Sequence, residues 1–166
     1  MEPGARSVEP PGEFADTRRR QPGSLRSRAL KLLARRDYSL IELERWLAPH
    51  AADPGELATL LMDLQRLGWL SERRLAEQLV RKSAARYGAR RIAEQLQERG
   101  IDPAIARSLK SELQATELQR ATAVWAKHFG HLPGDLRERG RQARFLERRG
   151  FDPDVIGRVL RGAWEE

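Results

Sequence analysis

The 166-residue chain contains no cysteine, which excludes disulfide bonds, thiol catalysis and thiolate metal ligands. No apolar stretch approaches the roughly 18 residues that a membrane-spanning helix needs. The first residues also lack the basic and then apolar pattern of a secretory signal peptide. We therefore expect a soluble protein that is not exported and that does not enter a membrane.

Motifs for catalysis or cofactor binding are also missing. The sequence has no Gly-rich phosphate loop, no His-Glu-x-x-His zinc motif and no Ser in a nucleophile motif. Its three histidines are His50, His128 and His131, and neither a cysteine nor a nearby pair of carboxylates completes a metal site around them. We predict a protein that is not an enzyme and that uses no metal, cofactor or small-molecule substrate.

Positive charge, by contrast, is present in excess. The chain has 31 Lys and Arg against 24 Asp and Glu, a formal net charge of +7, and most of the basic residues are Arg. The planar guanidinium group suits phosphate and carboxylate acceptors. The leading partner is therefore nucleic acid or an acidic protein surface, and the alternative is a solvated Arg-rich surface without a partner.

The N-terminal segment differs in composition from the rest. Residues 1–23 hold four of the nine prolines and a single aromatic side chain, Phe14. Such a segment cannot bury enough apolar area to offset the entropy lost on ordering. We predict a disordered tail over residues 1–23.

From Ser24 onward the apolar residues keep helical spacing. Leu57, Leu60, Leu61 and Leu64 lie at i, i+3, i+4 and i+7, which is the pattern of one face of a helix. No stretch alternates apolar and polar residues with the period of a strand. The predicted fold class is all-α.

An internal repeat organises these helices. Asp-Pro recurs at intervals of 49 and 50 residues, as Asp53-Pro54, Asp102-Pro103 and Asp152-Pro153. Asp is a good N-cap, and Pro is favoured at the first helical position, so each dipeptide is predicted to begin a helix. Gly100 and Gly150 suit the left-handed end of the preceding helix. The first unit has no glycine at that point, and we expect a looser junction there.

Three units of three helices follow from this repeat. The predicted helices are 24–36, 39–48 and 53–67 in a first unit of 24–70; 71–86, 88–99 and 102–114 in a second unit of 71–114; and 116–129, 135–149 and 152–164 in a third unit of 115–166. We expect units this small to be stabilised by contacts with their neighbours, in an elongated and curved solenoid-like array. The tryptophans, at 46, 69, 125 and 164, are predicted to pack inside the units rather than to stack on bases.

An excess of positive charge recurs once in each predicted unit. Segments 24–50, 71–100 and 135–150 carry net charges of +3, +4 and +3, whereas the segments that contain the Asp-Pro helices are neutral or negative. Stacked units would align the positive segments in one basic stripe. Such a stripe fits a polymer of phosphates or a long acidic groove.

The densest positive segment lies around Gly88, which is predicted to separate two helices and to bring their basic ends together. A solvated surface, partly offset by Glu77, Glu94 and Glu98, is the alternative to a binding patch. Tyr87 would stack or form a hydrogen bond, although Tyr38 at the same point of the first unit favours a structural role for both. The predicted partner-binding residues are Arg35, Arg36, Arg81, Lys82, Arg86, Tyr87, Arg90 and Arg91.

Four stretches resemble the RecX family, small bacterial regulators of the RecA recombinase, across about residues 26–162. They are residues 28–39 followed by Glu42-Leu43; residues 64–70; residues 86–92 with Leu96, Gly100 and Ile101; and residues 148–151. At residues 71–76 the chain departs from the family pattern of two acids and an aromatic residue before the alanine. That departure weakens any inference about the contacts of this helix.

The resemblance implies a non-enzymatic modulator made of tandem three-helix repeats. Proteins of this family lodge in the helical groove of the RecA filament on single-stranded DNA, suppress its ATPase and strand exchange, and favour filament loss. The implied partners are the RecA filament and single-stranded DNA, bound by a monomer in the bacterial cytoplasm. The residues alone leave two other classes open, a DNA- or RNA-binding protein independent of RecA and a scaffold for an acidic protein.

Overall fold

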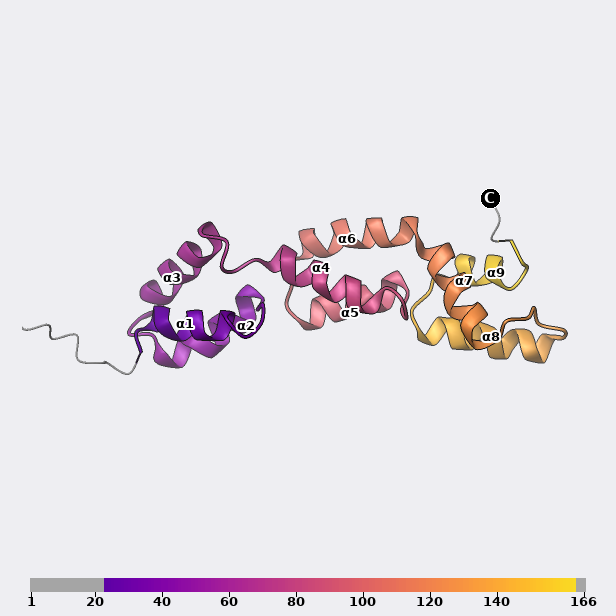
Figure 1. Ribbon diagram of the computed structural model, residues 1–166, viewed down its shortest axis with the longest axis horizontal. Coiled ribbons are helices and arrows are strands. Elements are labelled where there is room, and N and C mark those ends of the chain that lie inside the picture. The colour runs from indigo at the N-terminus through magenta and orange to yellow at the C-terminus, as the bar shows by residue number, and fades with distance from the viewer. Residues whose placement is uncertain (1–22, 164–166) are drawn as a thin grey trace, which may run out of the picture.

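The computed structural model describes residues 23–163, and over this range the chain is all-helical (Figure 1). The α-helices are α1 (Leu25–Leu33), α2 (Leu40–Leu47), α3 (Pro54–Arg66), α4 (Glu72–Ser83), α5 (Ala89–Glu98), α6 (Pro103–Ala115), α7 (Glu117–His128), α8 (Leu136–Arg148) and α9 (Pro153–Val159), with a short 3-10 helix, η1 (Ala48–His50), after α2. The all-α prediction is confirmed. No helix in this range is long and apolar enough to cross a membrane. The predicted tail, except Gly23, and Trp164 lie outside the described residues.

The helices form three consecutive groups of three, placed end to end along an elongated molecule (Figure 1). We call them unit one (α1–α3), unit two (α4–α6) and unit three (α7–α9). Each unit surrounds its own core, and the most buried apolar side chains are Leu43, Leu47 and Leu64 in unit one, Ile92 and Leu96 in unit two, and Leu146, Phe151 and Val159 in unit three. The prediction of tandem three-helix repeats is confirmed.

The three Asp-Pro dipeptides begin the third helix of each unit. The carboxylate of Asp53 accepts a hydrogen bond from the Glu56 amide at 2.9 Å, and Pro54 is the first residue of α3. Asp102-Pro103 and Asp152-Pro153 occupy the same positions at the start of α6 and α9. An N-cap acceptor followed by proline satisfies one free amide and removes another that would have no partner.

Three helices end at least three residues earlier than the sequence predicts. Helix α1 ends at Leu33 instead of 36. Helix α4 ends at Ser83 instead of 86, because the carbonyl of Ser83 accepts from the amides of both Arg86 and Tyr87 and closes a turn there. Helix α9 ends at Val159 instead of 164, because Gly162 adopts a left-handed conformation with φ of 74°. A left-handed residue cannot continue a right-handed helix.

The prediction that the tryptophans pack inside the units holds for Trp125 and is wrong for two others. Trp125 is 5% exposed, whereas Trp46 is 60% exposed and Trp69 is 53% exposed. On α2 the core positions belong to Leu43 and Leu47, and Trp46 lies outside them. Trp69 follows the end of α3, where the next residue, Leu70, enters the core instead.

A carboxylate at the start of α4 joins units one and two. Glu72 accepts from the Leu40 amide at 2.8 Å, at the start of α2, and from the Asp102 amide at 3.1 Å, just before α6. Its charge therefore lies at the positive ends of two helices that belong to different units.

A second carboxylate joins units two and three in the same way. Glu117, at the start of α7, accepts from the Ala89 amide at 3.1 Å and from the Asp152 amide at 3.3 Å. Here the carboxylate is buried, with 3% of the residue exposed. The repeat in the sequence thus extends to the contacts between the units.

Ion pairs reinforce the first junction. Arg74 lies 2.7 Å from Asp37, and its hydrogen bond to that carboxylate lowers the pKa of Asp37. Arg99 lies 2.7 Å from Glu42. Burial would raise the pKa of Glu42, but hydrogen bonds from Arg99 and from the Ser39 amide bring it below its ordinary value. Both carboxylates therefore stay charged at neutral pH and hold unit two against unit one.

Candidate basic interface

The basic residues around Gly88 lie on the end of α4, in the turn that follows and on the first turn of α5. Arg81, Lys82 and Arg86 are exposed, and none of them pairs with a carboxylate among residues 23–163. A guanidinium or ammonium group without an internal partner keeps its full charge for an external anion. These three predicted partner-binding side chains are therefore available to an external anion.

The turn between α4 and α5 also contacts unit three. The Gly88 amide donates to the Arg149 carbonyl at 2.8 Å, and the Arg90 amide donates to the Gly150 carbonyl at 3.3 Å. A Cβ atom at Gly88 would overlap the backbone of Gly150, so only glycine allows this approach. The Arg90 side chain reaches across and donates to the Glu147 carbonyl at 2.9 Å. The basic patch of unit two therefore adjoins the C-terminal end of α8.

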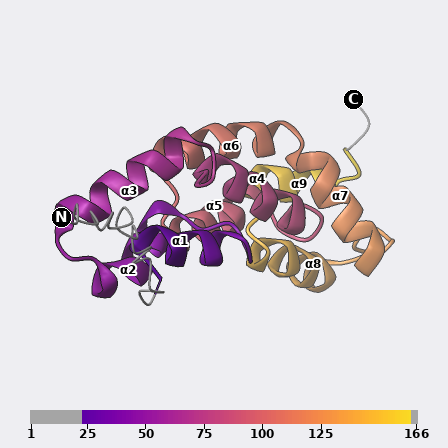
Figure 2. The ribbon, with the colours of Figure 1, turned by 60° about the vertical axis from the view of Figure 1, so that its left-hand side comes forward.

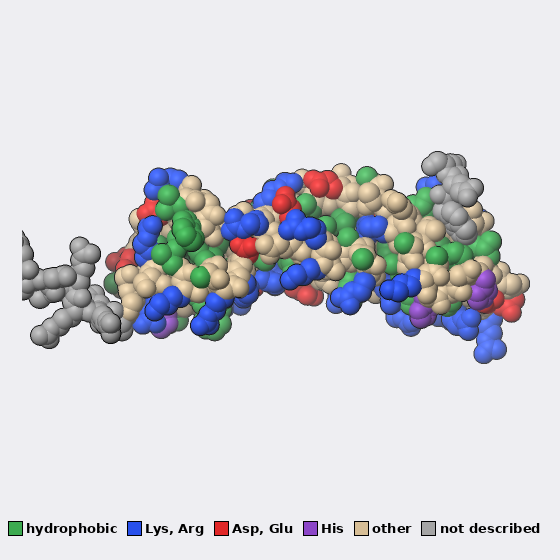
Figure 3. All heavy atoms as spheres, viewed as in Figure 1, with side chains coloured by type: hydrophobic (Ala, Val, Ile, Leu, Met, Phe, Trp, Pro, Cys, Tyr) green, Lys and Arg blue, Asp and Glu red, His purple; other side chains and the backbone are tan. Residues whose placement is uncertain are grey.

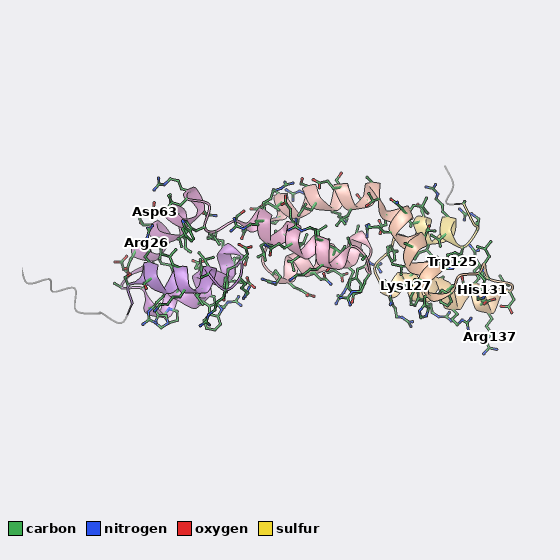
Figure 4. All side chains as sticks on the ribbon, viewed as in Figure 1. Arg26, Asp63, Trp125, Lys127, His131 and Arg137 are labelled. Atoms are coloured by element: carbon green, nitrogen blue, oxygen red, sulfur yellow. The ribbon has the colours of Figure 1, made fainter. Side chains whose placement is uncertain are left out.

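Helix α8 carries a row of arginines that leads away from this contact. Its members are spaced at i, i+4, i+7 and i+11, which places them on one face of the helix, and they are Arg137, Arg141, Arg144 and Arg148. All four are exposed, and within the described chain only Arg141 forms an ion pair, with Glu138 at 3.3 Å. Arg137 lies at the outer tip of unit three (Figure 4).

The net charge of +3 over residues 135–150 is evident in the sequence, but the predicted interface residues do not include these arginines. Their spacing of three and four residues in the sequence indicates that they share one face of a helix. With Arg81, Lys82, Arg86 and Arg90, the α8 row forms what we call the basic strip.

The two long edges of the molecule differ in charge. The third helices of the units (α3, α6 and α9) lie towards one edge, and the middle helices (α2, α5 and α8) lie towards the other (Figures 1 and 2). Lys and Arg side chains recur along the edge of the middle helices over all three units (Figure 3). This arrangement follows from the sequence, where the segments with the third helices carry no net positive charge.

Two predicted interface residues are held by internal ion pairs. Arg91 lies 3.0 Å from Glu94 on the same helix. Arg36 lies 3.3 Å from Glu42, and its guanidinium stacks over the Tyr38 ring at 3.7 Å. Both are less available to an external anion than Arg81, Lys82 and Arg86, which form no such pair among residues 23–163.

Tyr87 is half-buried and packs against the core of unit two, while its carbonyl accepts from Arg120 at 2.6 Å. Tyr38 is buried in the core of unit one. The guanidinium of Arg86 lies 5.4 Å from the centre of the Tyr87 ring. The two tyrosines therefore serve their units structurally.

Arg35 lies apart from the basic strip, on unit one, where it lines a shallow hollow between α1 and the end of α2. The structure thus distributes the predicted residues over two places. Nowhere in residues 23–163 do three or more potential ligands gather as a metal site would require. The chemistry that this surface offers is the binding of phosphate or carboxylate groups.

Two family models match the chain. One describes the third three-helix domain of RecX and matches residues 115–160, and the other describes its second three-helix domain and matches residues 71–108. A solved structure, RecX from Lactobacillus salivarius, superposes with a TM-score of 0.73 over 84% of this chain and 94% of that chain. At 19% sequence identity this match shows a common fold.

Curated relatives extend the match over most of the chain. The regulatory protein RecX of Ralstonia nicotianae is 44% identical over 144 residues, which cover 87% of this chain and 91% of the relative. That of Leptothrix cholodnii is 46% identical over 143 residues, with 86% and 91% covered. That of Neisseria gonorrhoeae is 40% identical, with 86% and 93% covered. The chain belongs to the RecX family of regulatory proteins.

Proposed function

We propose that this protein is a non-enzymatic modulator of the RecA recombinase in the bacterial cytoplasm. It binds as a monomer in the helical groove of the RecA filament on single-stranded DNA, inhibits ATPase and strand exchange, and favours filament disassembly. Membership of a family of regulatory proteins supports this proposal. So does the elongated shape, which suits a groove better than a pocket.

The observation that carries the proposal is the continuity of the basic strip. The backbone contact between Gly88 and Gly150 joins the cations of unit two to the arginine row of α8. Each exposed charge contributes only about 0.2–1 kcal/mol to binding. Several such contacts in register along one groove give a useful affinity, and they require a rigid spacing that matches the filament. A rod held in this way occupies the groove through which a second DNA strand would exchange.

Measuring the ATPase of RecA on single-stranded DNA tests the proposal. The variant Arg81→Ala/Lys82→Ala/Arg86→Ala removes three unpaired cations from the strip. A matched control, Arg26→Ala/Arg66→Ala/Arg107→Ala, removes three exposed cations, two of them on α3 and α6 at the opposite edge. The strip variant should need roughly tenfold more protein for half-inhibition, and the control should behave as the wild type. Equal inhibition by the strip variant and the wild type would contradict the proposal.

A protein that binds DNA or RNA independently of RecA is the alternative, because unpaired guanidinium groups also bind bare phosphate. Comparing the affinity for a bare oligonucleotide with that for a RecA-coated one separates the two. Tighter binding to the coated strand supports the modulator, and equal binding supports the alternative.

A further inference from the structure

The hollow on unit one combines an exposed aromatic ring with positive charge. Its volume is about 200 Å³, and it lies between α1 and the end of α2. Trp46 and His50 line it from the α2 side, and Arg28, Lys31 and Arg35 line it from the α1 side. The basic strip, in contrast, contains no exposed tryptophan.

Helical spacing explains how these groups meet. Arg28 and Lys31 lie at i and i+3 on the face of α1 that borders α2, and Arg35 lies in the turn that follows α1. Trp46 stands one residue before Leu47, which is buried in the core of unit one. The indole is thereby left at the rim with 60% of the residue exposed. An indole with most of its surface exposed loses much of the stabilisation that burial would give, and this exposed surface is available to an external ligand.

The charges in the hollow are not neutralised internally. None of the lining residues carries a carboxylate. Arg28 donates to the Gly23 carbonyl at 3.2 Å, whereas Lys31 and Arg35 make no ion pair with any other residue in the range 23–163. A flat ring flanked by unpaired cations complements a ligand that has both flat faces and negative charge.

We propose that this hollow binds one unstacked base of a single strand of nucleic acid. The base stacks on Trp46, and Lys31 and Arg35 contact the phosphates beside it. Stacking platforms flanked by cations are the general means of binding single strands without sequence preference. A protein helix as the occupant would require a wider apolar surface than one indole. This contact goes beyond the proposed function, because it gives unit one its own affinity for the strand without RecA.

Two fluorescent probes of equal length separate stacking from charge: an oligothymidylate and an abasic strand with the same number of phosphates. The wild-type protein should bind the oligothymidylate on the order of tenfold more tightly than the abasic strand. Trp46→Ala should abolish this preference and leave the affinity for the abasic strand unchanged. Trp46→Phe should keep part of the preference. The matched control is Trp69→Ala, because Trp69 is similarly exposed but lies outside the hollow.

Lys31→Ala/Arg35→Ala tests the other half of the site. This variant should weaken binding to both probes, and each lost phosphate contact should reduce the slope of log affinity against log salt by about 0.7. Circular dichroism checks that every variant is helical. Trp46→Leu, which keeps an apolar side chain of similar reach, replaces Trp46→Ala if the latter unfolds, and it should lose the preference in the same way.

Four results would overturn the proposal. The first three are a wild type without preference between the probes, a preference that survives in Trp46→Ala, and a Trp46→Ala variant that loses affinity for the two probes equally. A variant that binds both probes as the wild type does but no longer inhibits RecA would assign Trp46 to a protein contact, and this would also overturn it. Because the probes contain no RecA, failure here leaves the proposed function standing, and failure of the ATPase test leaves this site standing.

Discussion

His131 lies in the loop between α7 and α8 at the outer end of unit three (Figure 4). Its Nε2 atom lies 2.8 Å from the Glu138 carboxylate, and its Nδ1 atom lies 2.8 Å from the Phe129 carbonyl. Both neighbours are acceptors, so the doubly protonated ring satisfies both. The hydrogen bond to Glu138 and then that to Phe129 raise the pKa of His131. Hydrogen bonds from the Gly134 amide and from His131 lower the pKa of Glu138.

This raised pKa predicts a pH-dependent contribution to the stability of the loop. The contribution is complete below about pH 6.5, the ordinary value for histidine, and it is lost as the pH rises through the folded-state pKa. An NMR titration of the His131 ring should give a pKa above the ordinary value. In Glu138→Gln the pKa should fall back towards that value. A titration curve that Glu138→Gln leaves unchanged would show that the contact does not form in solution.

The helices of neighbouring units are connected by two carboxylates, one at each junction. Glu72 and Glu117 each bind two backbone amides that begin helices of neighbouring units or precede them. The two differ in burial, because Glu117 is 3% exposed and Glu72 is only partly covered. Water can replace a partly exposed carboxylate but cannot reach a buried one.

Glu117→Ala should therefore lower the free energy of unfolding by about 2–4 kcal/mol, because it leaves the buried Ala89 amide and the partly buried Asp152 amide without an acceptor. Glu72→Ala should lower it by about 1 kcal/mol, since water satisfies part of the loss. Urea denaturation followed by circular dichroism measures both. Glu112→Ala on α6, an exposed residue 3.6 Å from Arg73, is the control and should change the free energy by less than about 0.5 kcal/mol. Equal losses for Glu72→Ala and Glu117→Ala would contradict the role of burial.

Local signals allowed most helices to be predicted from the sequence. Asp-Pro dipeptides and leucine periodicity act within a few residues, so they locate helix starts and core faces without knowledge of the tertiary structure. The exposure of Trp46 depends on how α1 packs against α2, and the contact of Glu117 with Ala89 spans 28 residues. Neither is visible in a local pattern. In the candidate site, Arg81 and Arg91 each have a glutamate within four residues in the sequence, but Glu94 pairs with Arg91 whereas Glu77 pairs with Arg73 instead of Arg81.

At the scale of the whole molecule, the order of the units decides what the surface can bind. Three separate cores alone would allow the units to turn relative to one another. The ion pairs of Asp37 and Glu42 restrain the first junction, and the close approach of Gly88 to Gly150 restrains the second. The cations of units two and three are thereby kept on one edge, where a single extended polyanion can meet them together.

If one phosphate polymer contacts the whole basic strip, the effects of neutralising its two halves should add. Arg81→Ala/Lys82→Ala/Arg86→Ala and Arg137→Ala/Arg144→Ala/Arg148→Ala should each reduce the magnitude of the salt slope of filament binding by about 2, and the combined variant by about 4, at roughly 0.7 per phosphate contact on a single strand. Binding is measured from low to high salt, with the Arg26, Arg66 and Arg107 variant as the control. A combined variant whose slope equals that of either half alone would show that the polymer follows only one unit.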